Sequence, residues 1–199
     1  PSCGTCRFCV SGMSHACVLG ARIAKGPQLY GTYRLRNTAG QNVGQFCLLG
    51  AFSEYAVVNQ DSVCVIDKRY PLDAACLVGC GVVGGFGAVV HRAKVRPGSS
   101  VLVIGVGGVG MNVIQGARVA GATTIIAADI VDQKLAWAKA FGATHTINVH
   151  EADVVATVME ITGGGGVDFA FEVISNPTTI GQAFAADVPY IVALVDLEE

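Results

Sequence analysis

Charged residues are scarce in this sequence, and neither sign is in large excess. Only 14% of the 199 residues are Asp, Glu, Lys or Arg, and the formal net charge is −2 at pH 7. Soluble domains typically carry about 25% charged residues, and proteins that bind nucleic acids or anionic lipids present a basic patch. The composition therefore predicts neither a nucleic-acid partner nor a membrane-surface partner.

A secretory leader, with a basic segment ahead of an apolar one, is also missing from the sequence. Residues 97–117 are uncharged and long enough to cross a bilayer, but their six glycines favour a strand, a turn and a helix instead. A cytoplasmic location is predicted, where cysteines stay reduced. Because 52% of the residues are hydrophobic and the chain starts at Pro1 without a methionine, it is expected to be a piece of a longer polypeptide.

Four of the eight cysteines lie within the first 17 residues, at the spacing Cys-x2-Cys-x2-Cys-x7-Cys. They are Cys3, Cys6, Cys9 and Cys17. Four thiolates bind Zn2+ tetrahedrally in structural sites that leave no open position. Bacterial iron–sulfur loops place the fourth cysteine three residues on and a proline after it, whereas here seven residues intervene and Val18 follows. The spacing predicts a structural zinc, with four unrelated buried cysteines as the alternative.

The segment Gly105–Gly110 reads GVGGVG and follows an all-apolar strand pattern. In a dinucleotide fingerprint, Gly105 makes the tight turn, Gly107 lets the backbone approach the pyrophosphate, and Gly110 lets helix and strand pack closely. Gly108 and Val109 open the helix, whose free N–H groups face the phosphates. The pattern predicts binding of NAD through these residues.

Asp129 lies nineteen residues beyond Gly110, at the end of the next expected strand. A carboxylate there accepts hydrogen bonds from the ribose hydroxyls and disfavours the extra phosphate of NADP. Asp129 therefore favours NAD, with a helix-capping role as the alternative. Lys134 is a further candidate for the ribose, or else a solvated helix lysine.

The expected elements change in character along the chain. The first third predicts short strands within 31–36, 41–46, 52–58 and 63–66, and the uncharged stretch 74–90 predicts a helix packed on all sides. Strands and helices then alternate: strands at 101–104, 124–129, 145–148, 167–172 and 190–195, helices at 109–120, 133–141 and 152–161. This alternation predicts an α/β fold with a doubly wound parallel sheet. From spacing alone, Cys47, Cys64, Cys76 and Cys80 are expected in the core.

These motifs together resemble the zinc-containing medium-chain alcohol dehydrogenases. The resemblance runs from residue 1 to about 184 and rests on CGTCRFCVSGMSHAC, FSEYAVV, IIAADI and LVGCGVVGGFGAVVHRAKVRPGSSVLVIGVGGVG. GTYRLR and GQNVGQF are most similar to the nicotinoprotein-like branch assayed with nitrosoaniline acceptors. The resemblance implies part of a β-rich GroES-like catalytic domain with a zinc lobe at 1–85, part of a Rossmann domain at 86–199, and a homo-oligomeric parent.

The resemblance also changes the interpretation of Cys80. In the family, the cysteine of the Gly-Cys-Gly motif is one of three protein ligands of a catalytic zinc, and Cys80 matches it. Its partners, a cysteine and a histidine, would lie before Pro1. A threonine that faces the nicotinamide in many members is replaced here by Gly84, and the sequence departs from the family after Phe184.

The sequence is therefore interpreted as a fragment of an NAD-dependent zinc alcohol dehydrogenase acting on small primary alcohols or aldehydes. With one of three ligands for the catalytic zinc, the fragment is expected to be inactive alone. Two alternatives remain open: a nonenzymatic module that binds zinc and a dinucleotide, and a relative of the quinone reductases, which usually lack the four-cysteine loop.

Overall fold

The computed structural model describes residues 2–20, 26–58, 60, 63–186 and 191–193. The chain divides into two compact units, Pro1–Arg69 and Tyr70–Glu199. The helical residues 72–93 fall in the second unit, while the domain boundary after residue 85 remains a prediction.

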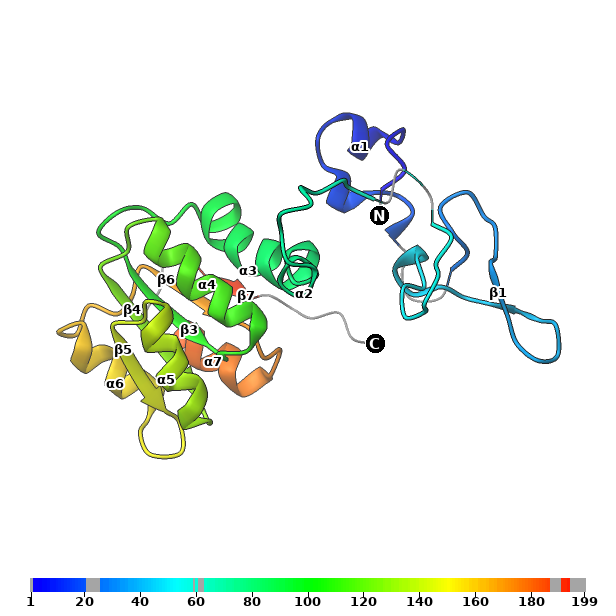
Figure 1. The fold of residues 1–199 in the computed structure, drawn as a ribbon. Coiled ribbons are helices and arrows are strands. Elements are labelled where there is room, and N and C mark those ends of the chain that lie inside the picture. The colour runs from blue at the N-terminus through cyan, green and yellow to red at the C-terminus, as the bar shows by residue number, and fades with distance from the viewer. Residues whose placement is uncertain (1, 21–25, 59, 61–62, 187–190, 194–199) are drawn as a thin grey trace. The chain divides into compact units, whose positions relative to one another are not determined.

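The second unit is built on a five-stranded sheet whose paired strands are all parallel, in the order β5-β4-β3-β6-β7 (Figure 1). The strands are β3 (Ser100–Ile104), β4 (Thr124–Asp129), β5 (His145–Asn148), β6 (Phe169–Glu172) and β7 (Ile191–Ala193). The helices that follow them are α4 (Gly108–Val119), α5 (Asp132–Phe141), α6 (Val154–Ile161) and α7 (Pro177–Ala185). The predicted doubly wound sheet is confirmed, and the chain reverses its direction of winding at β3.

Alternation along the strands divides the core into two layers. Val101 and Val103 on β3 pack with residues of α4 and α5 in one cluster, and Leu102 and Ile104 pack with residues of α6 and α7 in the other. Successive side chains of a strand point to opposite faces, so an all-apolar strand is buried on both sides. The continuous apolar run predicted from sequence is the signature of this central position.

The residues before β3 form a chain of short helices: α2 (Leu72–Ala75), the π-helical η5 (Val78–Val82), α3 (Val83–Gly87) and the π-helical η6 (Ala88–Ala93). A Cβ on Gly85 would lie 2.3 Å from the carbonyl oxygen of Val109, so only glycine allows α3 to approach α4 this closely. The predicted burial on all sides is wrong, because Leu77, Val78 and Val83 are exposed. Within the described residues of the unit, the side of this stretch that faces α4 is covered.

By length and apolar composition, the helical stretch Leu72–Ala93 is also sufficient to cross a membrane. The core helices of soluble proteins meet the same two criteria, and of its five glycines only Gly85 lies so close to α4 that a Cβ would clash. The absence of a membrane partner stays a prediction.

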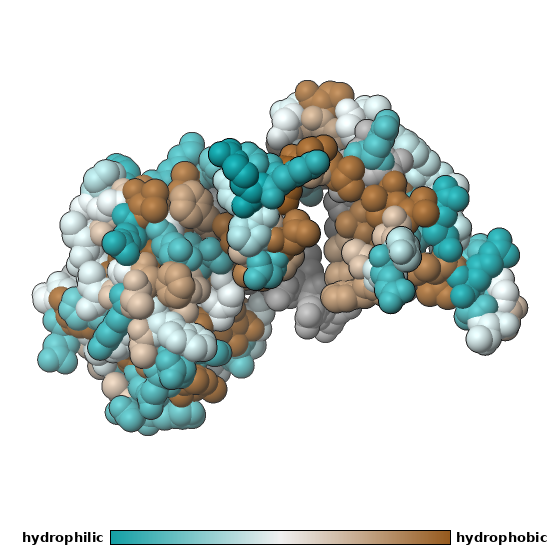
Figure 2. All heavy atoms as spheres, in the orientation of Figure 1, coloured by the Kyte–Doolittle hydropathy of each residue, from teal (hydrophilic) through white to brown (hydrophobic). Residues whose placement is uncertain are grey.

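The described residues of the first unit have little regular structure, and Figure 2 shows apolar side chains on the surface of this unit. It contains α1 (Arg7–Val10), η1 (Ser14–Ala16), η3 (Phe46–Leu48) and one hairpin, β1 (Leu35–Arg36) with β2 (Asn42–Val43). The hairpin turns at Asn37, whose side-chain oxygen accepts from the backbone N–H groups of Ala39 and Gln41. Strands predicted within 31–36 and 41–46 are thus confirmed as short pieces, whereas 52–58 and 63–66 form none. Phe52 and Val65 are almost fully exposed, so β propensity there finds no neighbouring strand to pair with.

The cysteines expected in the core are another correction. Cys64, Cys76 and Cys80 are exposed, and Cys47 is only half-buried. The preference of lone cysteines for the interior is statistical, and these four lie outside the well-packed sheet.

Asp168 joins the beginnings of β3 and β6. Its carboxylate accepts hydrogen bonds from the backbone N–H (2.7 Å) and the hydroxyl (2.8 Å) of Ser100, and the hydroxyl accepts in turn from the backbone N–H of Asp168 (2.9 Å). The Ser100 N–H, followed by its hydroxyl, lowers the pKa of Asp168 below its ordinary value of 3.8. The pair therefore stabilises the folded state when Asp168 is ionised.

We expect Asp168→Asn to lower the free energy of unfolding of the second unit by about 1 kcal/mol at pH 7. Because the folded-state pKa is depressed, the stabilisation is complete above about pH 5 and is lost as the pH falls through the folded value. Urea unfolding of both proteins between pH 7 and pH 3 measures this difference. A difference in the free energy of unfolding that does not change with pH would contradict the stabilising role of ionised Asp168.

Candidate functional site

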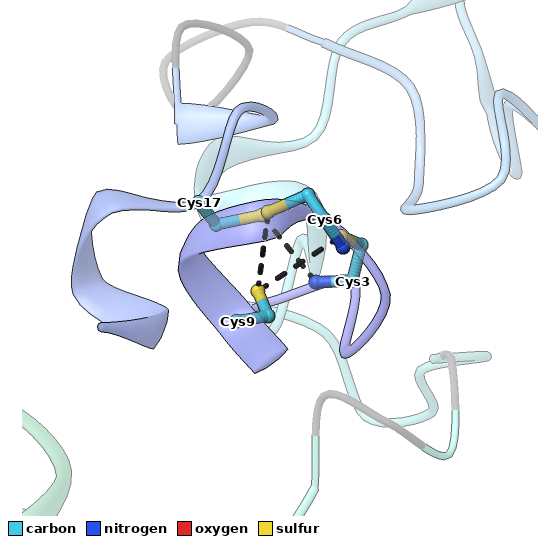
Figure 3. Close-up of side chains that lie close together, drawn as sticks. All are labelled: Cys3, Cys6, Cys9 and Cys17. Carbon is cyan, nitrogen blue, oxygen red and sulfur yellow. Dashed lines mark hydrogen bonds between the residues drawn. The ribbon is translucent and has the colours of Figure 1, made fainter. Parts of the chain in front are cut away.

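The four N-terminal cysteines converge on one point of the first unit (Figure 3). Their sulfur atoms all lie within 4.8 Å of one another; the Sγ of Cys9 is 3.9 Å from that of Cys3 and 3.5 Å from that of Cys6. A tetrahedral zinc with Zn–S bonds of about 2.3 Å requires sulfur atoms about 3.8 Å apart. The predicted ligands Cys3, Cys6, Cys9 and Cys17 therefore fit a four-sulfur zinc site.

Backbone N–H groups donate hydrogen bonds to two of these sulfur atoms. The N–H of Cys6 donates to the Sγ of Cys3 (3.3 Å), and the N–H of Cys3 donates to the Sγ of Cys17 (3.4 Å). Hydrogen bonds led by that from the Thr5 backbone lower the pKa of Cys3 to about 6, whereas desolvation raises the pKa of Cys9 to about 11. Four adjacent thiolates therefore need a cation to coexist, which is the chemistry of a bound metal.

The glycine-rich loop connects β3 to α4 in the second unit. Gly105 has φ +94°, in the left-handed region that favours glycine. A Cβ on Gly110 would lie 1.9 Å from the carbonyl oxygen of Gly105. A Cβ on Gly107 would instead meet no atom within 4 Å. Gly105 and Gly110 thus shape the turn, whereas Gly107 leaves open space at the start of α4, where helix N–H groups are free.

Asp129 ends β4 beside this loop and is 7% exposed. One carboxylate oxygen accepts from the backbone N–H of Val106 (2.7 Å) and the other from that of Val131 (3.0 Å). The ammonium of Lys134 lies 3.8 Å from the oxygen bonded to Val106. A carboxylate has about four acceptor positions, so Asp129 keeps capacity for a ligand's hydroxyl groups.

A cavity of about 580 Å³ lies at the carboxyl ends of the parallel strands. Of the predicted cofactor residues, Gly105, Gly107, Asp129 and Lys134 line it. Gly108, Val109 and Gly110 do not line it but form the first turn of α4. Its volume suits a small-molecule site, and ligands of doubly wound sheets bind at this edge, where the winding reverses.

The residues of the opposite wall of the cavity are not among those predicted from the sequence. This wall comes from the end of β6 and from α7, through Ile174, Asn176, Thr178, Thr179 and Gln182. The available signal was positional, since the residue after each parallel strand arrives at the same edge of the sheet.

Cys80, the predicted ligand of a catalytic zinc, lies exposed in η5. Within the described residues, the only group of three or more side chains that could hold a metal ion is the N-terminal cysteine cluster. The structure therefore does not bring Cys80 into a ligand set, and its role as a ligand stays a prediction.

This chain is similar in sequence to known dehydrogenases. Residues 108–186 match the family described as zinc-binding dehydrogenase. The chain is 43% identical over 190 residues to S-(hydroxymethyl)glutathione dehydrogenase of Saccharomyces cerevisiae, covering 92% of the chain and 49% of that protein. It is 40% identical over 188 residues to alcohol dehydrogenase 6 of Rattus norvegicus, covering 94% of the chain and 50% of that protein.

Solved structures show the same relationship. An alcohol dehydrogenase zinc-binding domain protein from Burkholderia ambifaria matches with a TM-score of 0.85 and 40% identity, over 94% of this chain and 50% of that one. Benzyl alcohol dehydrogenase from Acinetobacter calcoaceticus matches with a TM-score of 0.83 and 32% identity, over 100% and 55%. The chain thus spans about half the length of the relatives it matches.

Proposed function

We propose that this chain is the part of a zinc-containing medium-chain alcohol dehydrogenase that carries a structural zinc and binds NAD. It is similar to dehydrogenases over more than nine-tenths of its length. The observation that carries the proposal is the meeting of the glycine loop and Asp129 at one cavity, at the sheet edge where dinucleotides bind. The proposed substrates of the whole enzyme are small alcohols or aldehydes.

In this proposal, different residues of the chain bind different parts of the cofactor. The open space at Gly107 and the amino end of α4 receive the pyrophosphate, and Asp129 accepts hydrogen bonds from the adenosine ribose. When bound, NAD supplies the hydride acceptor for alcohol oxidation. The cysteine cluster holds a closed zinc that organises its lobe and takes no part in the reaction.

Zinc content, NADH titration and an alcohol oxidation assay test this proposal. We expect one zinc per chain, saturable NADH binding seen by fluorescence, and no turnover of primary alcohols with NAD, since no described ligand group includes Cys80. If NADH fails to bind, the cofactor assignment is wrong. Robust turnover by this chain would instead contradict the proposal that catalysis needs further zinc ligands besides Cys80.

The isolation of Cys80 also favours a second candidate, a nonenzymatic module that binds zinc and a dinucleotide. The coding sequence upstream of Pro1 separates the two. A cysteine and a His-Glu pair there would complete a catalytic zinc site, and their absence would favour the binding module.

The proposed location is the cytoplasm and the proposed assembly of the whole enzyme is a homo-oligomer. None of the eight cysteines, all of which lie in described residues, forms a disulfide, which suits a reducing compartment.

Asp129→Asn is expected to weaken NADH binding about tenfold and to narrow the preference for NADH over NADPH by at least as much. The amide keeps the size of the side chain but no longer repels the extra phosphate of NADPH. Fluorescence titrations with both coenzymes measure the change. Asp132→Asn is the matched control, because Asp132 is exposed and does not line the cavity. If Asp129→Asn has the same ratio of NADH to NADPH affinity as the wild type, Asp129 is not the residue that selects between the two coenzymes.

A further inference from the structure

Glu172 is a fully buried carboxylate at the end of β6, with 0% of its surface exposed. Among the described residues, the ion pairs are Arg69–Asp67 and Lys134–Asp129, so none includes Glu172. Burying a carboxylate without a counter-ion is costly unless hydrogen bonds compensate it. The function proposed above gives this residue no task.

Among the described residues, the hydrogen bonds to the Glu172 carboxylate come from the segment that follows it. Its Oε1 accepts from the backbone N–H groups of Ile174 (2.9 Å) and Ser175 (3.1 Å) and from the hydroxyl of Thr179 (2.7 Å). Its Oε2 also lies 3.1 Å from the Ser175 nitrogen. Ser175 has φ +63°, a strained value for a residue other than glycine, and the carboxylate holds the backbone there.

The segment held in this way packs against the glycine loop. A Cβ on Gly105 would lie 2.6 Å from Cγ1 of Ile174, and a Cβ on Gly110 would lie 3.4 Å from Cγ2 of Val173. Ile174 and Thr179 also line the cavity that contains Asp129. The position of the β6–α7 turn therefore sets the width of the cavity opposite the loop.

We propose that Glu172 is a positioning residue of the dinucleotide site, which holds the turn 173–176 as the wall facing the glycine loop. The proposal rests on the function proposed above and deepens it. Because this wall shares its cavity with Asp129, the proposed ribose acceptor, Glu172 governs affinity for the adenosine half of the cofactor. It acts through the backbone and touches no reacting atom.

Glu172→Gln is the most direct test, since the amide keeps the shape but replaces one acceptor oxygen with an NH2 group. We expect dissociation constants for NADH and for ADP-ribose to rise by the same factor, about tenfold or more. We also expect faster amide hydrogen exchange at Ile174 and Ser175 without ligand, while the amides of β3 exchange as in the wild type. Zinc content is expected to stay unchanged.

Two further variants keep the test decisive. Glu160→Gln makes the same change of charge at an exposed residue of α6 that does not line the cavity, and is expected to bind like the wild type. If Glu172→Gln does not fold, Thr179→Val removes one donor to the carboxylate and Thr179→Ser retains it. Weaker ADP-ribose binding by the valine variant, with wild-type binding by the serine variant, is the expected pattern.

Each outcome bears on a different proposal. Failure of the wild type to bind NADH overturns the proposed function, and the exchange of the Ile174 and Ser175 amides still reports on Glu172. If the wild type binds and Glu172→Gln binds equally well, with only a lower melting temperature, Glu172 is merely structural and the positioning role is overturned. Unchanged amide exchange overturns it as well.

Discussion

Gly107→Val is expected to weaken NADH binding strongly while the second unit stays folded. The backbone at Gly107 has φ −85° and ψ −162°, values that valine adopts without strain, and a Cβ there meets no protein atom within 4 Å. The empty space is where the pyrophosphate must approach the backbone. We therefore expect a loss of affinity on the order of a hundredfold, with a melting temperature close to that of the wild type.

Gly110→Ala provides the contrasting variant. Its Cβ would lie 1.9 Å from the carbonyl oxygen of Gly105, so α4 must move away from β3. We expect this change to lower the free energy of unfolding by about 2–3 kcal/mol. Gly181→Ala, in α7 with no atom within 4 Å of its Cβ, is the control and is expected to be neutral or slightly stabilising.

NADH fluorescence titration and thermal unfolding separate these three variants. If Gly107→Val binds NADH normally, the cofactor does not approach this loop. If Gly107→Val and Gly110→Ala are equally unstable, the space beside Gly107 is not open, and the distinction between a binding glycine and a packing glycine is wrong.

The second large effect is expected at the cysteine cluster. Cys17→Ser, or removal of the metal by a chelator, is expected to unfold the first unit while the second unit still binds NADH. The part of the first unit that the structure describes has few helices and strands and few buried apolar side chains, among them Leu29 and Leu48. A four-cysteine zinc contributes roughly 10–16 kcal/mol in small zinc-binding peptides, which such a core cannot replace.

Elemental analysis, limited proteolysis and NADH titration measure this outcome together. We expect the first unit of Cys17→Ser to be cut rapidly and the second to resist. Cys64→Ser is the matched control, because Cys64 is exposed and outside the cluster. Iron in place of zinc, or a first unit that resists protease without metal, would rule out a structural zinc.

The two units differ in how well the sequence predicts them. In the sheet, the helix predicted at 133–141 is α5 (Asp132–Phe141), and the strand predicted at 124–129 is β4 (Thr124–Asp129). These elements carry their own signals, namely continuous apolar strands and a glycine cap at Gly142. The strands predicted at 52–58 and 63–66 lack such support, because a strand in a β-rich region forms only where a distant segment pairs with it.

The candidate site divides in the same way. The glycine loop and Asp129 belong to one compact motif whose spacing is visible in the sequence. Ile174 and Thr179 reach the same cavity from about seventy residues beyond Gly105, and only the parallel topology brings them there. The role of Glu172 is not predictable from the sequence, because a glutamate at the end of an apolar strand gives no signal that it is fully buried.

The hydrogen bond from the Val106 N–H to Asp129 has a consequence for altering coenzyme preference. The side chain expected to discriminate between NAD and NADP also fastens the phosphate-binding loop to the neighbouring strand. Truncation to glycine or alanine would leave a buried amide without an acceptor and would loosen the loop. Redesign toward NADP at this position therefore calls for a neutral side chain that still offers an oxygen to Val106.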